Sequence, residues 1–334
     1  MSVTESDEAP RSHTGPGFSD AVTYAFGDVD AQLFGIARVG LAPGEGGTTE
    51  ASGLAILFAG FEPIAVRAAG GLTVDAGAGW DDVDAAGVRT LTHVPLKDWD
   101  VSFTSDDGRS GFQLRYTALS PAGALTADRA AAIAGGTEGY DQLCRVTGLA
   151  TVHGEERAVH CLGQRGHSWG APDWERIALA RTVSAWIEED LALSVTAIRP
   201  ANAKSHADEA LAASLFATLD EDGAVEAIAI EEARLSTTSD ADGRQRRASI
   251  EVFVDEDDPG RRAAGQVLCG TSLDLGRLRL DCAFFAWRMD GRSGVGRYDV
   301  LRRATDLRAR ARMTAEFGHR LAAPEATHLF SREP

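Results

Sequence analysis

The chain has 334 residues, of which 44% are hydrophobic, and carries a formal net charge of −17. This length exceeds the size at which a single hydrophobic core keeps growing, so we expect two domains. The acidic balance argues against nucleic acid or an anionic membrane surface as a partner, because both attract clusters of Lys and Arg. No apolar run reaches the roughly 18 residues of a membrane-spanning helix, and no signal peptide is visible, so we expect a cytoplasmic protein without membrane insertion.

The first half of the chain begins with a polar tail, residues 1–18, that we expect to be disordered because it contains little apolar surface to bury. After it, short apolar stretches alternate with turn signals, a pattern typical of strands joined by hairpins. The strands expected here are residues 31–39, 53–58, 64–68, 71–74, 99–103, 112–116, 143–152 and 157–162. The turn at residues 106–108 is expected to pair the strands on either side of it. One short helix is expected over residues 126–134, with Thr126 as its cap and Gly135 as its stop.

The second half repeats this pattern. Its expected strands are residues 181–186, 191–199, 211–219, 224–230, 247–255, 278–289 and 295–302, and a weaker helical pattern covers residues 304–321. Many short strands with so few helical periods predict an all-β fold. We expect two antiparallel β-barrel or sandwich domains in tandem, residues 19–163 and 164–334.

Sequence motifs for a cofactor or metal are missing. The glycine cluster at residues 43–47 is followed by no Gly-Lys-Ser/Thr, so it predicts a hairpin connection and not a phosphate loop. The glycines at 294–297 lie between two strands, whereas a dinucleotide fingerprint needs a strand and then a helix. The acidic run at 255–258 lacks the ligand spacing of a calcium loop. The four cysteines show no C-x-x-C spacing, so we expect reduced thiols and no zinc site.

The densest group of chemically capable residues is the central motif, residues 163–174, which reads Gly-Gln-Arg-Gly-His-Ser-Trp-Gly-Ala-Pro-Asp-Trp. Its glycines and proline predict a fixed loop or bend. His167 is either a general acid with a pKa near the working pH or a buried histidine bonded to backbone or an acid. Asp173 either orients His167 or caps the next turn. Arg165 either pairs with a buried acid or binds substrate.

The remaining candidates are aromatic and hydroxyl side chains. Trp169 and Trp174 either line a pocket, where they stabilise a developing cation, or belong to the core. Ser168 is a candidate for substrate binding only, because the Gly-x-Ser-x-Gly elbow of a hydrolase is absent. Trp287 and Tyr298, in late strands, either face a second cavity or are ordinary sheet residues.

Residues 165–174 resemble the Arg-Asp-His-Ser-Trp-Gly-x-Arg-Asp-Trp signature of a bacterial family of tandem lipocalin-like proteins, related to AttH-like proteins and carotenoid hydratases (hydroxyneurosporene synthases). Residues 24–26, followed by residues 35–40, are similar to the opening strands of that family, and residues 139–148 are similar to its lead-in strand. This sequence departs from the signature twice, with Gly166 in place of the acid and Pro172 in place of the Arg. If the missing acid serves the imidazole, another acid has to replace it.

The resemblance implies two lipocalin-like barrels and an apolar cavity for one small hydrophobic molecule. It implies a cofactor-independent enzyme that hydrates, isomerises or cyclises a polyene, terpenoid or polyketide by general acid/base catalysis. The alternative is a lipophile-binding or carrier protein that uses the same cavity without chemistry. The cavity is expected in one of the barrels or in the cleft between them, near His167, Trp169 and Trp174.

Overall fold

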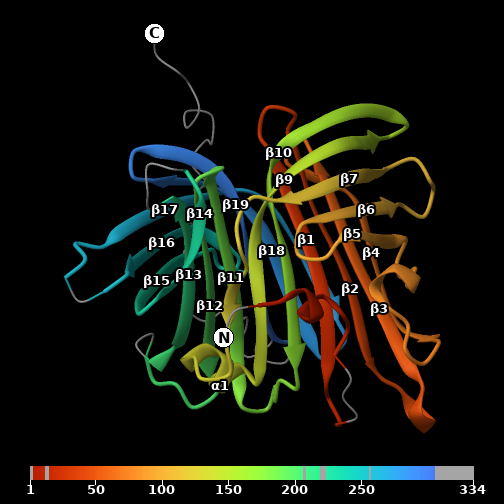
Figure 1. The fold of residues 1–334 in the computed structure, drawn as a ribbon, viewed down its shortest axis with the longest axis horizontal. Coiled ribbons are helices and arrows are strands. Elements are labelled where there is room, and N and C mark those ends of the chain that lie inside the picture. The colour runs from red at the N-terminus through yellow and green to blue at the C-terminus, as the bar shows by residue number, and fades with distance from the viewer. Residues whose placement is uncertain (1–2, 12–14, 206–207, 219–222, 256, 305–334) are drawn as a thin grey trace.

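The computed structural model describes residues 3–11, 15–205, 208–218, 223–255 and 257–304. These residues form two antiparallel β-sheets and little helix, which confirms the predicted all-β fold (Figure 1). Apart from its first residue, the helix predicted over residues 304–321 lies outside the described residues. No helix in the described ranges is long and apolar enough to cross a membrane.

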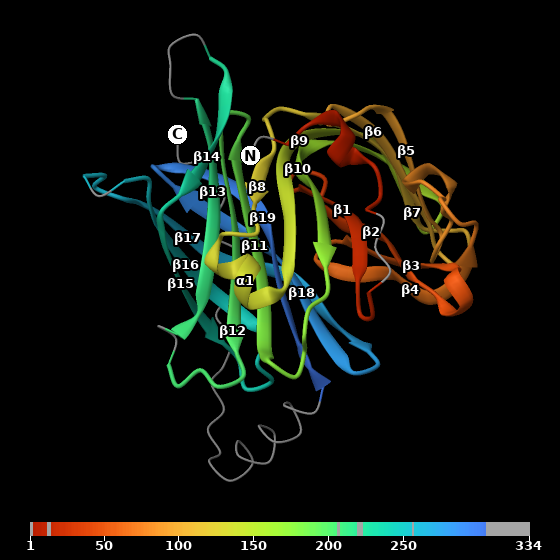
Figure 2. The same cartoon turned by 60° about the horizontal axis from the view of Figure 1, so that its bottom comes forward.

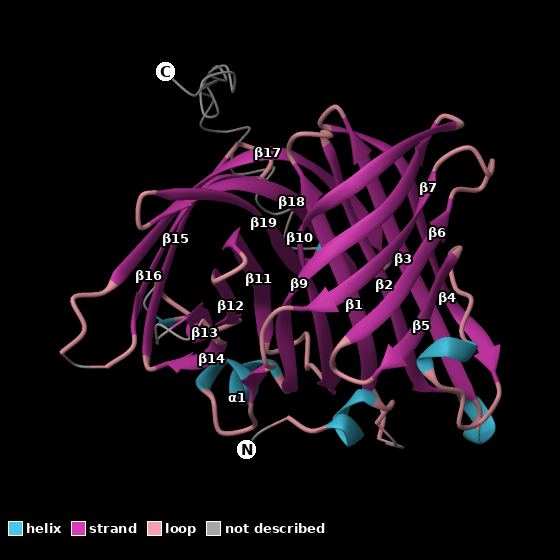
Figure 3. Cartoon of the chain, turned by 45° about the horizontal axis from the view of Figure 1, so that its top comes forward, coloured by secondary structure: helices cyan, strands magenta, loops and turns pink. Residues whose placement is uncertain are grey.

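The first sheet follows the order β4-β3-β2-β1-β10-β9-β7-β6-β5, and β8 pairs with β9 at its side. Its strands are β1 (Ser19–Asp28), β2 (Leu33–Pro43), β3 (Thr49–Ala59), β4 (Glu62–Val74), β5 (Val88–Val94), β6 (Asp98–Thr104), β7 (Gly111–Ala118), β8 (Gly123–Leu125), β9 (Thr137–Val152) and β10 (Glu155–Gly170). Short 3-10 helices are η1 (Glu5–Glu8), η2 (Glu45–Gly47) and η3 (Trp80–Asp82). The sheet curls strongly around its own interior (Figure 3).

The second sheet follows the order β14-β13-β12-β11-β19-β18-β17-β16-β15. Its strands are β11 (Ile177–Glu188), β12 (Leu191–Pro200), β13 (Ala210–Thr218), β14 (Val225–Ile230), β15 (Glu232–Ser239), β16 (Gln245–Phe253), β17 (Arg261–Leu275), β18 (Leu278–Met289) and β19 (Arg292–Arg303). In each sheet the last strand returns to pair with the first, so β10 lies beside β1 and β19 lies beside β11. Apart from the side strand β8, the two halves therefore share one strand order, as expected for tandem domains of one type.

The alternation of apolar and polar residues decides which face of each strand is buried. In β6, Trp99, Val101 and Phe103 are buried between more exposed residues. The hairpin predicted across residues 106–108 is confirmed, because Trp99 lies opposite Tyr116 in β7. Gly108 adopts a φ of +68° in that turn, a conformation that glycine adopts without strain.

Three main clusters of apolar side chains form the core. One fills the interior of the first sheet, around Phe26 and Trp99, and a second fills the interior of the second sheet, around Phe285 and Trp287. A third joins the facing surfaces of the two sheets (Figure 2), where Phe284 packs against rings of the first sheet. Aromatic rings therefore belong to the core inside each sheet and also to the core between the sheets.

Local predictions need correction in two places. The helix expected over residues 126–134 is shorter, as α1 (Ala130–Gly135), because the Thr126 hydroxyl bonds the Asp128 carboxylate and leaves the helix uncapped. Residues 163–170 of the central motif form no loop: they complete β10 and pair with β1 and β9. The expected boundary between residues 163 and 164 falls inside that strand, and the chain passes to the second sheet between β10 and β11.

Candidate functional site between the two sheets

Strand alternation divides the central motif between the two faces of β10. Arg165 and His167 point into the interior of the first sheet and are fully buried. Gln164, Gly166 and Ser168 lie on the opposite face, toward the second sheet. One short motif therefore contributes to two different environments.

His167 is held by hydrogen bonds at both ring nitrogens. Its Nε2 lies 2.7 Å from Oδ1 of Asp20, and its Nδ1 lies 3.0 Å from the backbone carbonyl oxygen of Asp7. The ring packs edge-on against Trp80 and Trp169. This confirms the prediction of a buried histidine bonded to an acid and to backbone.

Arg165 pairs with a buried acid, Glu8, at 2.5 Å between Nη2 and Oε1. The same carboxylate accepts hydrogen bonds from the Trp99 indole and the Leu96 backbone, each at 3.0 Å. The guanidinium also lies 4.8 Å from the ring centre of Tyr140. Burial raises the pKa of Tyr140 to about 12, so its hydroxyl stays protonated. Arg165 therefore forms a structural ion pair with Glu8, and the Glu8 carboxylate balances its positive charge inside the first sheet.

Glu8 belongs to the tail that was predicted to be disordered, and that prediction is wrong for residues 3–11. Besides Glu8, this segment is anchored by Arg11, whose backbone N–H donates to Asp20 Oδ2 at 2.6 Å. The Arg11 guanidinium lies 4.1 Å above the Trp169 ring. The segment thus covers one end of the first sheet, near β1 (Figure 3). Composition alone hides this, because one buried acid in a polar stretch leaves no periodic signal.

The open space in this part of the molecule lies between the two sheets. A cavity of about 300 Å³ is bounded by β1, β2, β8, β9 and β10 on one side and by β11, β12, β13 and β19 on the other. Its lining includes the polar residues Thr23, Arg38, Thr137, Glu138, Tyr140, Asp141, Gln164, His167, Ser168, Thr182, Ser194, Thr196, Ser214 and Arg297, and the larger apolar residues Leu125, Trp174, Ile177, Ile198 and Leu301. The cavity lies in the predicted cleft, but its wall is more polar than predicted.

Asp141 is a partly buried acid on this wall. Its Oδ2 accepts a hydrogen bond from the Ser194 hydroxyl, in the second sheet, at 2.5 Å. Burial raises the pKa of Asp141, although hydrogen bonds from Ser194 and Gln164 and the charge of Arg297 oppose the rise. Asp141 could not be predicted as a site residue from the sequence, because a single acid in a strand belongs to no recognisable motif.

Gly166 explains how Asp141 reaches this place. The two residues are cross-strand partners, and a Cβ built on Gly166 would lie 2.6 Å from Oδ1 of Asp141. A side chain at residue 166 would therefore collide with the carboxylate. Asp141 puts a carboxylate where the side chain of the signature acid would begin, and His167 takes its acid from Asp20.

The other residues predicted for the site either line the cavity near Asp141 or lie away from it. Asp173 is exposed and accepts a hydrogen bond from the backbone N–H of Glu175 at 3.0 Å, so it caps its own turn and is not the partner of His167. Trp174 lines the cavity, as does Ser168, whereas Trp169 packs against His167 and Arg11.

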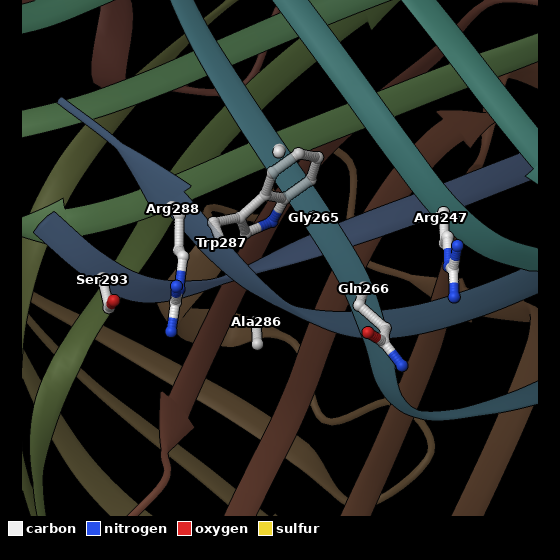
Figure 4. Close-up of a pocket in the computed structure, with 8 residues that line it drawn as sticks. Arg247, Gly265, Gln266, Ala286, Trp287, Arg288 and Ser293 are labelled. Carbon is white, nitrogen blue, oxygen red and sulfur yellow. The ribbon is translucent and has the colours of Figure 1, made fainter. Parts of the chain in front are cut away.

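Trp287 and Tyr298 are core residues of the second sheet. Tyr298 bonds the Thr237 hydroxyl at 2.5 Å. A smaller pocket of about 180 Å³ adjoins Trp287, and Figure 4 shows the Trp287 ring and the Arg288 side chain pointing to opposite sides of β18. Among the described residues, no three His, Cys, Asp or Glu side chains gather as a metal site would require.

Several solved structures share this fold. Three of them are an AttH-like protein from Nitrosomonas europaea (TM-score 0.59, 14% identity, 85% of this chain and 91% of that chain covered), kievitone hydratase from Nectria haematococca (0.57, 12%, 86% and 89%), and CghA with Sch210972 (0.54, 12%, 86% and 89%). These likenesses confirm the expected relationship to AttH-like lipocalin-type proteins at the level of the fold. A search of curated proteins found no match.

A protein-family model matches nearly all of the described chain. It is described as a domain of unknown function (DUF7064) and matches residues 4–304, which include the N-terminal segment with Glu8, both sheets and the cavity between them. The chain therefore belongs to the DUF7064 family and has the two-sheet fold of AttH-like proteins.

Proposed function

We propose that the protein is an enzyme that protonates, and in the simplest case hydrates, a small and largely apolar molecule in the cavity between the two sheets. The observation that carries this proposal is Asp141, a carboxyl group on the cavity wall whose pKa is raised by burial. A general acid works best when its pKa lies near the working pH, and a raised pKa brings a carboxyl group toward that condition.

The proton balance of a hydration is simple. Neutral Asp141 donates its proton to one carbon of a double bond, which leaves a cation on the substrate. Water adds to that cation and loses a proton to the Asp141 carboxylate, so the acid is restored and one water has been added. The Ser194 hydroxyl holds the carboxyl group in place, and the Trp174 ring on the cavity wall is suited to stabilise the cation.

The names of the structural neighbours support this class of reaction. One neighbour is a hydratase by name, and another holds the compound Sch210972. Isomerisation or cyclisation would begin with the same proton transfer and proceed without the addition of water. His167 is poorly placed to act as the acid, because its ring is buried and both of its nitrogens have partners.

Turnover of candidate polyenes, terpenoids and polyketides tests the proposal. We expect the purified protein to convert one of these classes, with loss of conjugated absorbance and, for a hydration, a gain of one water in mass. Asp141→Asn should lower kcat by about 100-fold or more, the usual scale for a general acid. Asp173→Asn is the matched control, since this acid is exposed and bonds only its own turn. Equal turnover by the wild type and Asp141→Asn would contradict the proposal.

The alternative is a carrier that binds a lipophile in the same cavity without chemistry. The observation that favours it is the apolar part of the wall, around Trp174, Ile177 and Ile198, which needs no acid. Tight binding of a lipophile that Asp141→Asn leaves unchanged, together with no turnover of any class, would decide for the carrier.

A further inference from the structure

The cavity between the sheets contains a guanidinium group, that of Arg38, with no direct partner in the part of the chain that the structure describes. Arg38 lies on β2 between Ala37 and Val39, which belong to the core inside the first sheet, so its side chain points the other way, into the cavity. Among the described residues, the Arg38 guanidinium makes no hydrogen bond and no ion pair within 4.0 Å. A partly buried guanidinium with unused donors indicates an acceptor that arrives from outside the chain.

A second guanidinium acts on the same space from the opposite wall. Arg297, on β19, also lines the cavity. Burial lowers the pKa of Arg38, and the positive charge of Arg297 lowers it further. Arg297 has its own carboxylate, Asp299, at 2.6 Å from its Nε. The pair therefore leaves about one positive charge, that of Arg38, without a contact ion.

The acids around the cavity do not supply that contact. Asp141 is bonded to Ser194, and burial raises its pKa, which disfavours its charged form. Asp20 lies close enough to act on Arg38 but is bonded to His167 and to the Arg11 backbone. Glu138, the other acid on the cavity lining, forms no ion pair with Arg38.

We propose that the molecule bound in this cavity is an apolar monocarboxylate, whose carboxylate is bound by Arg38 with the help of Arg297. The proposal rests on the cavity of the proposed function and names the class of its ligand. A guanidinium fork matches the two oxygens of a carboxylate, and one uncompensated positive charge suits a monoanion better than a phosphate dianion. The apolar body then lies against Trp174 and Ile198.

This arrangement places the ligand's charge beside the proposed acid. Arg297 acts on both Arg38 and Asp141, so the three groups share one part of the cavity. A bound carboxylate would offset the positive charges that lower the pKa of Asp141. The ligand therefore favours the protonated acid that its own reaction requires.

The test uses two probes of similar shape, 2-naphthylacetic acid, which is an anion at neutral pH, and its uncharged methyl ester. Binding is measured by quenching of Trp fluorescence at neutral pH. We expect the wild type to prefer the acid, and Arg38→Met to weaken acid binding by about tenfold or more, the scale of a hydrogen bond to a charged group. Ester binding should change less than about twofold. Arg89→Met is the control, because Arg89 is exposed and pairs with Asp84 outside the cavity.

Each outcome decides a different point. Equal affinity of the wild type for acid and ester overturns the carboxylate proposal and leaves the cavity of the proposed function standing. Binding of neither probe overturns the carboxylate proposal and counts against the cavity itself as a ligand site. The wild-type comparison of acid with ester decides the matter even if Arg38→Met fails to fold. Partial recovery of acid binding in Arg38→Lys would support a charge contact.

Discussion

At the residue scale, Arg165 depends on one carboxylate from the start of the chain. Removing one partner of a buried ion pair leaves an uncompensated charge, so Glu8→Ala should lower the free energy of unfolding by about 3–5 kcal/mol. Denaturant unfolding measures this change. Glu5→Ala, at an exposed position in the same 3-10 helix, is the control. If both variants lose the same amount, the Glu8–Arg165 pair is not what anchors the segment.

Asp141 predicts a dependence of stability on pH. Its pKa is raised in the folded state, so that state binds the proton more tightly than the unfolded chain does. The free energy of unfolding must therefore fall as pH rises from the ordinary Asp pKa through the raised value. Asp141→Asn removes this titration and keeps an acceptor for Ser194. We expect the variant to become progressively more stable than the wild type as pH rises through that window, measured by denaturant unfolding. A relative loss of stability with rising pH would refute the shift.

At the element scale, the paired positions 141 on β9 and 166 on β10 leave room for only one side chain, which is that of Asp141. Gly166→Asp should lower the free energy of unfolding by about 1–3 kcal/mol, because its Cβ meets the Asp141 carboxylate. The exchange Asp141→Gly with Gly166→Asp should recover most of that loss. Thermal and denaturant unfolding of the two single variants and the double variant form a mutant cycle. Additive losses would show that the two positions do not compete for this space.

The strands show which parts of the fold the sequence pattern predicts. The alternation in residues 99–103 and 112–116 specifies both strands and their hairpin, because the period of two fixes which side chains enter the core. The glycines of the central motif mislead for a physical reason. Gly166 is present because Asp141, its partner on another strand, needs the room, and no local bend is involved. Glu8 was missed because its partner Arg165 lies far along the chain.

At the scale of the whole molecule, two sheets with one strand order fill their own interiors and share a third core between them. Aromatic rings belong to all three of these cores, and Trp174 also lines the open space between the sheets. The cavity takes its lining from strands of both halves. Which side chains meet there depends on the register of each strand and on how the sheets pack, and neither follows from a single sequence.

The pKa of Asp141 depends on the whole molecule, because burial raises it while the Ser194 hydroxyl of the second sheet opposes the rise. A carbon-13 NMR titration of carboxyl-labelled Asp, with Asp141→Asn to identify the resonance, tests the proposed acid without a known substrate. We predict a carboxyl resonance that is absent from the variant and titrates clearly above the ordinary Asp value of about 3.9. A midpoint at or below that value would contradict the role of Asp141 as the general acid of the cavity.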